Sequence, residues 1–163
     1  MDFQNPDTLN AVAAFHTLFQ CPILPEPTIP DSKRCELRVS LLQEEVQELA
    51  DAIAAHDLVE IADALADIQY VLSGAVLEFG MAGRFKELFD EVQRSNMSKA
   101  CATVQEAEET QKHYVETKST DSTIEEVEGK FLVYRAGDRK VLKSVKYSAV
   151  DFSPILAAFT TTA

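Results

Sequence analysis

Two short clusters of acidic residues could together bind a metal ion. They consist of Glu44, Glu45 and Glu48, and of Glu60, Asp63 and Asp67. Carboxylate oxygens are the ligands that Mg²⁺ takes, in near-octahedral geometry. An ion held there would activate a water molecule and neutralise charge on a phosphate group. We therefore expect a Mg²⁺ site at these residues, with Mn²⁺ as the alternative ion.

An apolar stripe at helical spacing accompanies the first cluster. It recurs at i, i+4, i+7 and i+11, and consists of Leu42, Val46, Leu49 and Ile53. At about 100° per residue, Glu45 and Glu48 fall beside this stripe, and Glu44 lies further round. The pattern predicts a helix, capped by Asp31 or Ser32, that carries the acids at the edge of its core-facing side.

The second cluster lies on a more apolar helix. Its stripe consists of Leu58, Ile61, Leu65, Ile68 and Leu72. Glu60, Asp63 and Asp67 are spaced i, i+3 and i+7, so they share one face. The rest of this helix is apolar on most sides, which predicts that it is largely buried. Acids on such a helix repel one another and are costly to desolvate, and a divalent cation would offset both effects.

The connection between the two helices is short. Residues 54–57 make the helices antiparallel neighbours, so both acidic clusters come within reach of one site. His56 in this turn is expected to be a cap or surface residue and not a ligand. The alternative for the acids is a solvated charged face, as for most Glu runs in a chain of net charge −12.

The spacing Glu-Glu-x-x-Glu followed by Glu-x-x-Asp resembles the MazG-like, all-α nucleoside triphosphate pyrophosphohydrolases. The stretches EFGMAGRFKELFDEVQRSNMSKA and GDRKVLKSVKYSAVDFSPIL resemble further segments of one branch of that family. The resemblance implies a mainly α fold, an antiparallel helical bundle, here with a small C-terminal β-hairpin insert. It also implies Mg²⁺-dependent cleavage of a nucleoside triphosphate to the monophosphate and pyrophosphate.

Residue roles follow from the same resemblance. On the first helix, Glu45 and Glu48 are expected to be metal ligands. Glu44 is either a further ligand or the residue that orients and deprotonates the attacking water. The groups expected to contact substrate phosphates and ribose are Arg94, Asn96, Lys99, Lys143 and Tyr147. The alternative for the basic residues near position 97 is that they complement the dipole of a helix end.

The second helix can be aligned in two ways. Glu60-Ile-Ala-Asp63 matches Glu-x-x-Asp directly. An alignment anchored on residues 66–70 makes Asp67 the motif's Asp, with Ala64 where Glu is expected. We favour Glu60 and Asp63 as ligands and keep Asp67 beside them, because all three share a face.

The rest of the chain predicts one domain over residues 1–163. A helix from Asn5 or Asp7 to about Phe19 precedes a proline-rich strap at 21–30 that is expected to be extended. Gly80 and Gly83 mark a stop before a helix over 84–97.

An insert over residues 103–145 follows. It is expected to hold a polar helix capped near Thr103 and a hairpin that turns at Gly137-Asp138, with a further short strand over 124–127. A last short helix is expected after Asp151 or Ser153, with residues 157–163 frayed.

Composition excludes several classes of function. The chain has 163 residues, and its pI of about 4.6 argues against nucleic-acid binding, which needs a basic surface. No apolar run reaches the roughly 20 residues of a membrane span, and no signal peptide is evident. The three cysteines have no CxxC spacing and read as free thiols in the cytoplasm, and no zinc-ligand pattern occurs.

Rival functions remain. Phosphoribosyl-ATP pyrophosphohydrolase of histidine synthesis would share the fold and the chemistry. A non-enzymatic acidic helical interaction protein would share only the helices. A di-iron bundle is disfavoured because no acidic residue of the clusters has a His three positions on. The apolar side chains exceed what two helices could bury, so we expect a homodimer or homotetramer.

Overall fold

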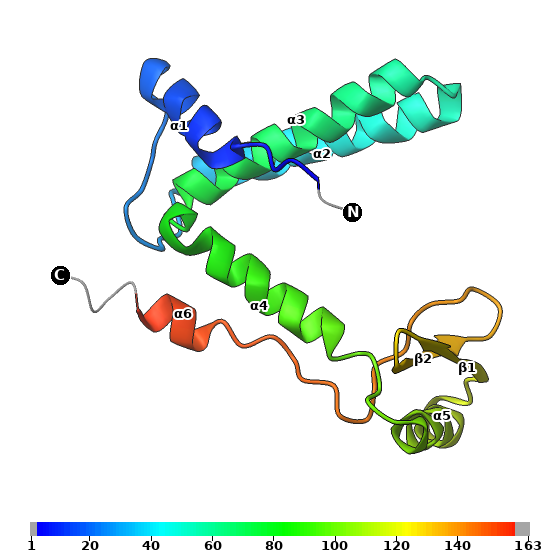
Figure 1. Ribbon diagram of the computed structural model, residues 1–163. Coiled ribbons are helices and arrows are strands. Elements are labelled where there is room, and N and C mark those ends of the chain that lie inside the picture. The colour runs from blue at the N-terminus through cyan, green and yellow to red at the C-terminus, as the bar shows by residue number, and fades with distance from the viewer. Residues whose placement is uncertain (1–2, 159–163) are drawn as a thin grey trace. The chain divides into compact units, whose positions relative to one another are not determined.

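The structure is a computed structural model that describes residues 3–158. The chain forms two compact units, which are described separately. Unit 1 contains the described residues up to Phe85 and from Leu156 onward, and unit 2 contains Lys86–Ile155. The fold is mainly helical with one small antiparallel hairpin, as the sequence predicts (Figure 1). Of the residues expected to fray, 159–163 lie outside the described part.

Unit 1 is built on an antiparallel pair of long helices, α2 (Ser32–Ala55) and α3 (Leu58–Glu78), with α1 (Thr8–Leu18) packed on α3 (Figure 1). The side chain of Asp31 accepts hydrogen bonds from the backbone N–H groups of Lys33 and Arg34, which starts α2. His56 has a φ of 56° and closes α2, as expected of a cap. The carboxylate of Asp57 then caps α3, so the tight antiparallel connection is confirmed.

The proline-rich strap runs extended beside the end of α3. Leu24 donates its N–H to Leu77 O at 3.0 Å, and Thr28 donates to Phe79 O at 3.1 Å. Gly80 has a φ of +67°, and a Cβ there would lie 1.8 Å from Glu26 O. Only glycine therefore fits where α3 ends against the strap.

A buried ion network joins α1, α2 and α3. Glu78 accepts hydrogen bonds from the guanidinium groups of Arg34 and Arg38. Arg38 also lies 3.2 Å from His16 Nε2, and His16 Nδ1 lies 2.8 Å from Pro22 O. His16, Arg38 and Glu78 are all buried, so this polar cluster forms part of the interior of unit 1.

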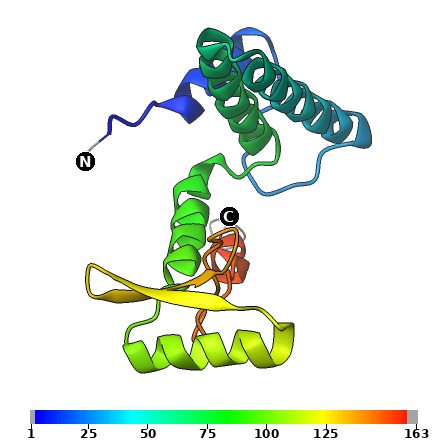
Figure 2. The same ribbon diagram turned by 90° about the vertical axis from the view of Figure 1, so that its right-hand side faces the viewer.

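Unit 2 contains all but the first residue of helix α4 (Phe85–Met97), which the short 3₁₀ turn Ala82–Arg84 precedes. Helix α5 (Val104–Lys118) follows and is capped by Thr103, as expected. Strands β1 (Ser122–Val127) and β2 (Lys130–Arg135) form a hairpin against α5 (Figure 2). The buried core of this part is Cys101, Ala107, Val133 and Leu142. Helix α6 (Ser153–Ala157) comes last, and only its residues up to Ile155 belong to unit 2.

The expected turn of the hairpin was wrong. The turn lies at Glu128-Gly129, where both residues have positive φ, 51° and 73°, and Val127 pairs with Lys130. Such two-residue turns match the twist of the flanking strands, which favours this turn. The segment expected as an extra strand is β1. Beyond Gly137, the only β-pairing among the described residues is an isolated bridge between Tyr134 and Val141.

Candidate catalytic site

The acidic residues of α2 and α3 differ in exposure. On α2, Glu45 is partly buried, whereas Glu44 and Glu48 are exposed. On α3, Asp67 is partly buried, whereas Glu60 and Asp63 are exposed. The predicted apolar stripes do not mark the buried side, because Val46 and Leu65 are exposed. The buried residues are Ala52 on α2 and Ala64 on α3, and Glu45 and Asp67 lie at helical spacing from them, so these two carboxylates lose the most solvent.

Glu45 stands out chemically. Its Oε2 atom is buried and has no hydrogen-bond partner among the described residues. Burial raises the pKa of the Glu45 carboxyl, and repulsion from neighbouring acids raises it further. Those acids are, in order of their effect, Glu48, Asp67, Glu44 and Asp63. Carboxylates of both helices therefore act on Glu45, as the antiparallel arrangement predicts.

Glu60 lies toward the end of the helix pair. With Glu48, Asp51 and Asp57 it lines an open hollow of about 420 Å³ beside the turn between α2 and α3. Glu48 belongs to both places, because it acts on Glu45 together with Asp63 and Asp67 and also lines this hollow. Both second-helix alignments place acids on the same face, and each proposed ligand stays a prediction.

The chemistry of the acidic face fits a hard divalent cation. Its donors are all carboxylate oxygens, and Oε2 of Glu45 has no hydrogen-bond donor beside it within residues 3–158. As the side chains stand, residues 3–158 contain no group of three His, Cys, Asp or Glu side chains converged closely enough to hold an ion. The ligands of an ion would therefore have to change rotamer to converge on it.

The basic residues expected to contact substrate gather at one place in unit 2. Lys99 donates to Asn96 Oδ1 at 2.7 Å, and Lys143 Nζ lies 4.2 Å from the ring centroid of Tyr147. A hydrogen bond with Ser95, with Oγ 2.9 Å from the Tyr147 hydroxyl, lowers the pKa of Tyr147, and the charges of Lys143 and Lys99 lower it further. The structure thus brings α4 and the segment after the hairpin together.

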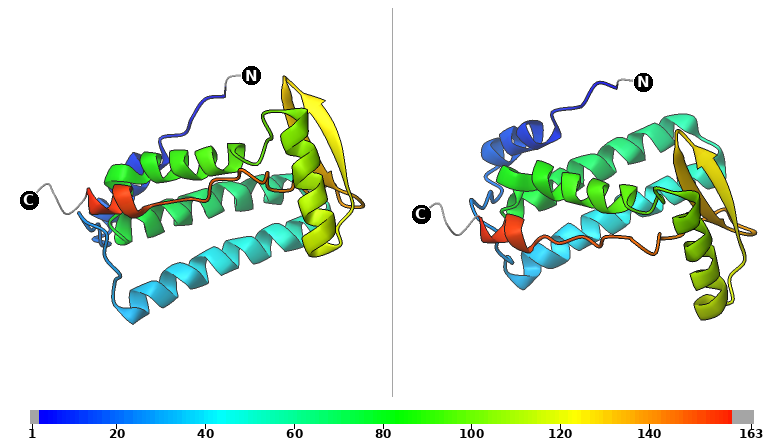
Figure 3. Two further views of the ribbon diagram at one scale, coloured as in Figure 1. Left: turned by 90° about the horizontal axis from the view of Figure 1, so that it is seen from below. Right: turned by 60° about the horizontal axis from the view of Figure 1, so that its bottom comes forward.

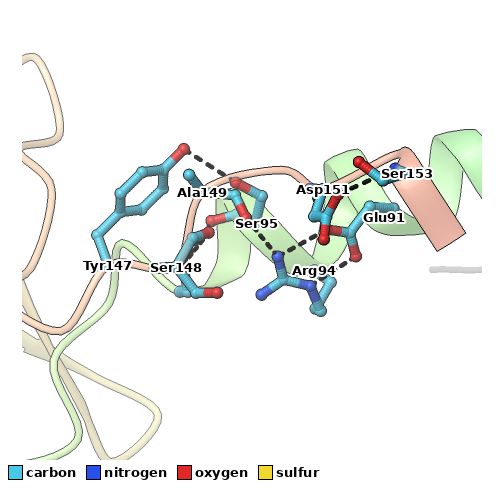
Figure 4. A network of polar contacts seen from close by, with 9 residues as sticks. Glu91, Arg94, Ser95, Tyr147, Ser148, Ala149, Asp151 and Ser153 are labelled. Carbon is cyan, nitrogen blue, oxygen red and sulfur yellow. Dashed lines mark hydrogen bonds and ion pairs between the residues drawn. The ribbon is translucent and has the colours of Figure 1, made fainter.

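The side chain of Arg94 is hydrogen-bonded to the segment after Tyr147. This segment runs back along α4 (Figures 3 and 4). Its guanidinium donates to Ala149 O at 2.8 Å and forms two hydrogen bonds with Glu91. The bonds from Arg94, followed by the one from the Asp151 N–H, lower the pKa of Glu91 to about 2. Arg94 therefore fixes this segment, and its contact with substrate stays a prediction.

Sequence reasoning missed three residues near this basic cluster. Ser95 holds the Tyr147 hydroxyl, and Arg135 and Lys140 line a hollow with Lys99 and Lys143. The scarcity of basic residues in this chain, 15 against 27 acidic, was the signal that could have identified Arg135 and Lys140. A serine inside a helix offers no comparable signal.

Within residues 3–158, every helix is too short or too polar to cross a lipid bilayer. This finding agrees with the absence of a long apolar run in the sequence.

Comparison with known proteins gives the family. The phosphoribosyl-ATP pyrophosphohydrolase family matches residues 12–96, which run from within α1 to nearly the end of α4 and include all six residues of the two acidic clusters. The chain is also similar to the uncharacterized protein L479 of Acanthamoeba polyphaga mimivirus. The two are 26% identical over 227 aligned positions, which cover 86% of this chain and 89% of the viral protein. The acidic helix pair, the mainly α fold and the family match agree, and the chain belongs to the phosphoribosyl-ATP pyrophosphohydrolase family, within the MazG-like all-α pyrophosphatases.

Proposed function

We propose that this protein is a Mg²⁺-dependent nucleoside triphosphate pyrophosphohydrolase that releases a nucleoside monophosphate and pyrophosphate. The proposal rests mainly on the surroundings of the Glu45 carboxyl group. Its Oε2 atom is buried without a partner, and acids from two helices raise its pKa. A fold gains no stability from that arrangement unless a cation completes it. Membership of a pyrophosphohydrolase family supports the same chemistry.

The residues that would hold the ion are Glu45, Glu48, Glu60, Asp63 and Asp67. When bound, Mg²⁺ lowers the pKa of a water molecule and neutralises charge on the phosphates. Glu44, exposed beside Glu45 on α2, would orient the attacking water and accept its proton. The water oxygen bonds to the α-phosphorus, and the bond from that phosphorus to the bridging oxygen breaks. Pyrophosphate leaves with the electron pair of that bond.

Basic groups of unit 2 would bind the phosphates and ribose. Lys99 and Lys143 each have a neutral partner, Asn96 and the Tyr147 ring, so their charges remain available to phosphate oxygens. Asn96 and Tyr147 carry the groups that hydrogen-bond a sugar hydroxyl. Because Ser95 and both lysines lower the pKa of Tyr147, its hydroxyl is a stronger hydrogen-bond donor.

A substrate panel tests this proposal. Canonical, deoxy and damaged nucleoside triphosphates are incubated with protein and Mg²⁺, and products are separated by HPLC. The wild type is expected to yield monophosphate and pyrophosphate, and Glu45→Gln to lower kcat about 10²–10⁴-fold. Glu36→Gln is the matched control, because Glu36 is an exposed glutamate of α2 outside the cluster. Equal rates in both variants would contradict the assignment of Glu45.

Phosphoribosyl-ATP is the second candidate substrate, and the family match favours it. It carries the same triphosphate, so the acids alone do not separate the two activities. Adding it to the panel does, because a phosphoribosyl-ATP enzyme would be inactive on simple triphosphates. Inactivity on every substrate without Mg²⁺ binding would favour a non-enzymatic acidic helical protein.

We also propose that the protein self-associates through α2 and α3. The N-terminal half of α3 was expected to be buried, yet Leu58 is 77% exposed and Leu65 53% exposed. Val46 and Ile53 on α2 are similarly uncovered. An apolar face of this kind is typical of a helix pair that packs against a second copy. A homodimer or homotetramer would cover it.

A further inference from the structure

The two strands of the hairpin differ in what covers their outer edges. On β2, Phe131 donates its N–H to Cys101 O at 3.0 Å and accepts a hydrogen bond from the Cys101 N–H at 2.8 Å. The carbonyl of Val133 accepts a hydrogen bond from the Leu142 N–H, also at 2.8 Å. The segments before and after the hairpin therefore cover the outer edge of β2.

The same hydrogen bonds define the outer edge of β1. Ile124 lies opposite Val133, and Glu126 lies opposite Phe131. In an antiparallel ladder, the backbone groups of two opposite residues point either toward each other or both outward. Because Phe131 and Val133 point theirs away from β1, Ile124 and Glu126 point theirs away from β2. Within residues 3–158, neither of them has a backbone partner on that side, so β1 presents a free edge.

An acidic hollow adjoins the start of this free edge. It measures about 550 Å³ and lies between α5 and the beginning of β1. Its carboxylates belong to Glu108, Glu116 and Asp121. Lys112 is the one cation among the described residues that line it, and its Nζ lies 3.8 Å from a carboxylate oxygen of Glu116. The lining therefore has an excess of negative charge, which attracts basic groups.

Ser122, the first residue of β1, connects the hollow to the free edge. Its carbonyl points outward like those of Ile124 and Glu126, and it accepts a hydrogen bond from the Gln111 side chain on α5. Its Oγ atom is buried and has no hydrogen-bond partner among the described residues. A buried hydroxyl without a partner costs free energy. A chain bound along the edge would recover that cost by hydrogen-bonding to this hydroxyl.

The side chains of β1 indicate which kind of strand fits beside it. Ser122, Ile124 and Glu126 share one face, and Ile124 packs there against the core next to α5. Thr123 and Val127 point to the opposite face and are exposed. Glu126 is also exposed, and its carboxylate has no partner within residues 3–158. A matching strand therefore carries basic side chains on the α5 side and β-branched side chains on the other.

We propose that the free edge of β1 binds a basic, extended segment of another protein, which adds to the hairpin as a further strand. Backbone hydrogen bonds would supply affinity, and the carboxylates of Glu126 and the hollow would select Lys or Arg on the α5 side. The same carboxylates disfavour β1 of a second copy, because two acidic edges would then face each other. This surface lies beyond residues 12–96, so the inference does not depend on the proposed hydrolysis.

A short blocked peptide of alternating lysine and valine tests this proposal on the full chain. Fluorescence anisotropy should show saturable binding at one peptide per chain, which weakens as salt is added. The same peptide with every backbone N–H methylated keeps its charges but donates nothing to the carbonyls of Ile124 and Glu126. Its affinity should fall by about tenfold or more. Equal binding of the two peptides, or no binding of either, would overturn strand addition.

Substitutions test the part that charge plays. Asp121→Asn and Glu126→Gln should each weaken peptide binding about two- to fivefold, because each removes one exposed negative charge. Glu109→Gln is the matched control, because Glu109 is an exposed glutamate of α5 that does not line the hollow. Equal weakening by all three would mean that the peptide responds only to net charge, which would overturn the assigned surface.

Amide hydrogen exchange locates the bound peptide. In the free protein, the N–H groups of Ile124 and Glu126 should exchange faster than that of Glu125, which points toward β2. The peptide should slow exchange at Ile124 and Glu126, and unchanged exchange at both would overturn the proposal.

The mass of the protein without peptide identifies any other occupant of the edge. Glu126→Pro removes an outward N–H and leaves the bonds to β2 in place, since proline is tolerated on edge strands. Light scattering should give this variant the same mass as the wild type. A lower mass would show that a second copy occupies the edge, which would overturn the assignment to a basic partner.

Discussion

Glu45 carries its carboxyl where burial and neighbouring acids both disfavour its charge. Its unpaired Oε2 and the repulsion from Glu48 and Asp67 are consequences of the same helix pair. Removing this charge from the metal-free protein should relieve repulsion. In the presence of a cation, the same change should remove a ligand. The sign of the effect of Glu45→Gln on stability therefore depends on Mg²⁺.

Thermal unfolding with and without Mg²⁺ measures whether Glu45→Gln stabilises or destabilises the protein. In EDTA, Glu45→Gln is expected to have a Tm equal to or above that of the wild type. At Mg²⁺ a hundredfold above its Kd, the wild type should gain about 2.7 kcal/mol. That gain corresponds to roughly 5–10 °C in Tm for a chain of this size. Glu36→Gln should gain as much as the wild type, and an equal gain in Glu45→Gln would contradict the ligand assignment.

Residue types and spacing could predict the acidic face, because i, i+3 and i+7 fix which side chains share one side of a helix. They could not predict that Arg94 is held by the chain after Tyr147. One of its partners, Glu91, lies on the same helix. The other, Ala149 O, lies 55 residues further along the chain. A basic residue has the same sequence signature whether it contacts substrate or backbone.

At the level of elements, the buried ion network is what ties α2 to the end of α3. Glu78 is fully buried, and it receives hydrogen bonds from both Arg34 and Arg38. Burial alone would raise the pKa of Glu78, but the bonds from Arg38 and Arg34 outweigh it and lower the pKa below its ordinary value of 4.5. The carboxylate is therefore charged in the folded protein.

Glu78→Gln is expected to destabilise the protein by about 3–5 kcal/mol, because it leaves two guanidinium groups without their partner in the interior. The loss should be complete above pH 4.5, where the unfolded chain also carries a charged Glu78. It should shrink as pH falls below 4.5, because the lowered pKa of the folded state is then approached. Urea unfolding from pH 7 to pH 3 measures both effects, with Glu36→Gln as the control. A pH-independent difference would exclude the ion pair as its cause.

Helix boundaries were predictable where a side chain caps the backbone. Asp31, Asp57 and Thr103 each accept a hydrogen bond from the first turn that they precede. The hairpin turn was less predictable, because Glu128-Gly129 and Gly137-Asp138 both contain a turn-forming glycine. The choice between them depends on which residues reach the core of unit 2. Val133 of β2 is fully buried there together with Ala107 of α5. That information is tertiary and is absent from local sequence.

For the molecule as a whole, the family match and the hollow lined by Lys99, Arg135, Lys140 and Lys143 involve different parts of the chain. The family covers residues 12–96, which a spacing of acids on two helices could identify. The hollow draws on Lys99, Tyr114, Arg135 and Lys140, four segments that no sequence period relates. Periodicity predicts faces of single elements, whereas a hollow lined by separate segments depends on how loops return.

Self-association is the prediction that concerns the whole molecule. Light scattering after size exclusion should give a mass of two or four times 18.0 kDa, because a second copy would cover the apolar face of α2 and α3. Leu65→Lys, which places a charge on that face, should shift the mass toward 18.0 kDa at micromolar protein. Val127→Lys is the control, since Val127 is 46% exposed at the hairpin end. A wild-type mass of 18.0 kDa would contradict self-association, and the apolar face of α2 and α3 would then be exposed to solvent in the monomer.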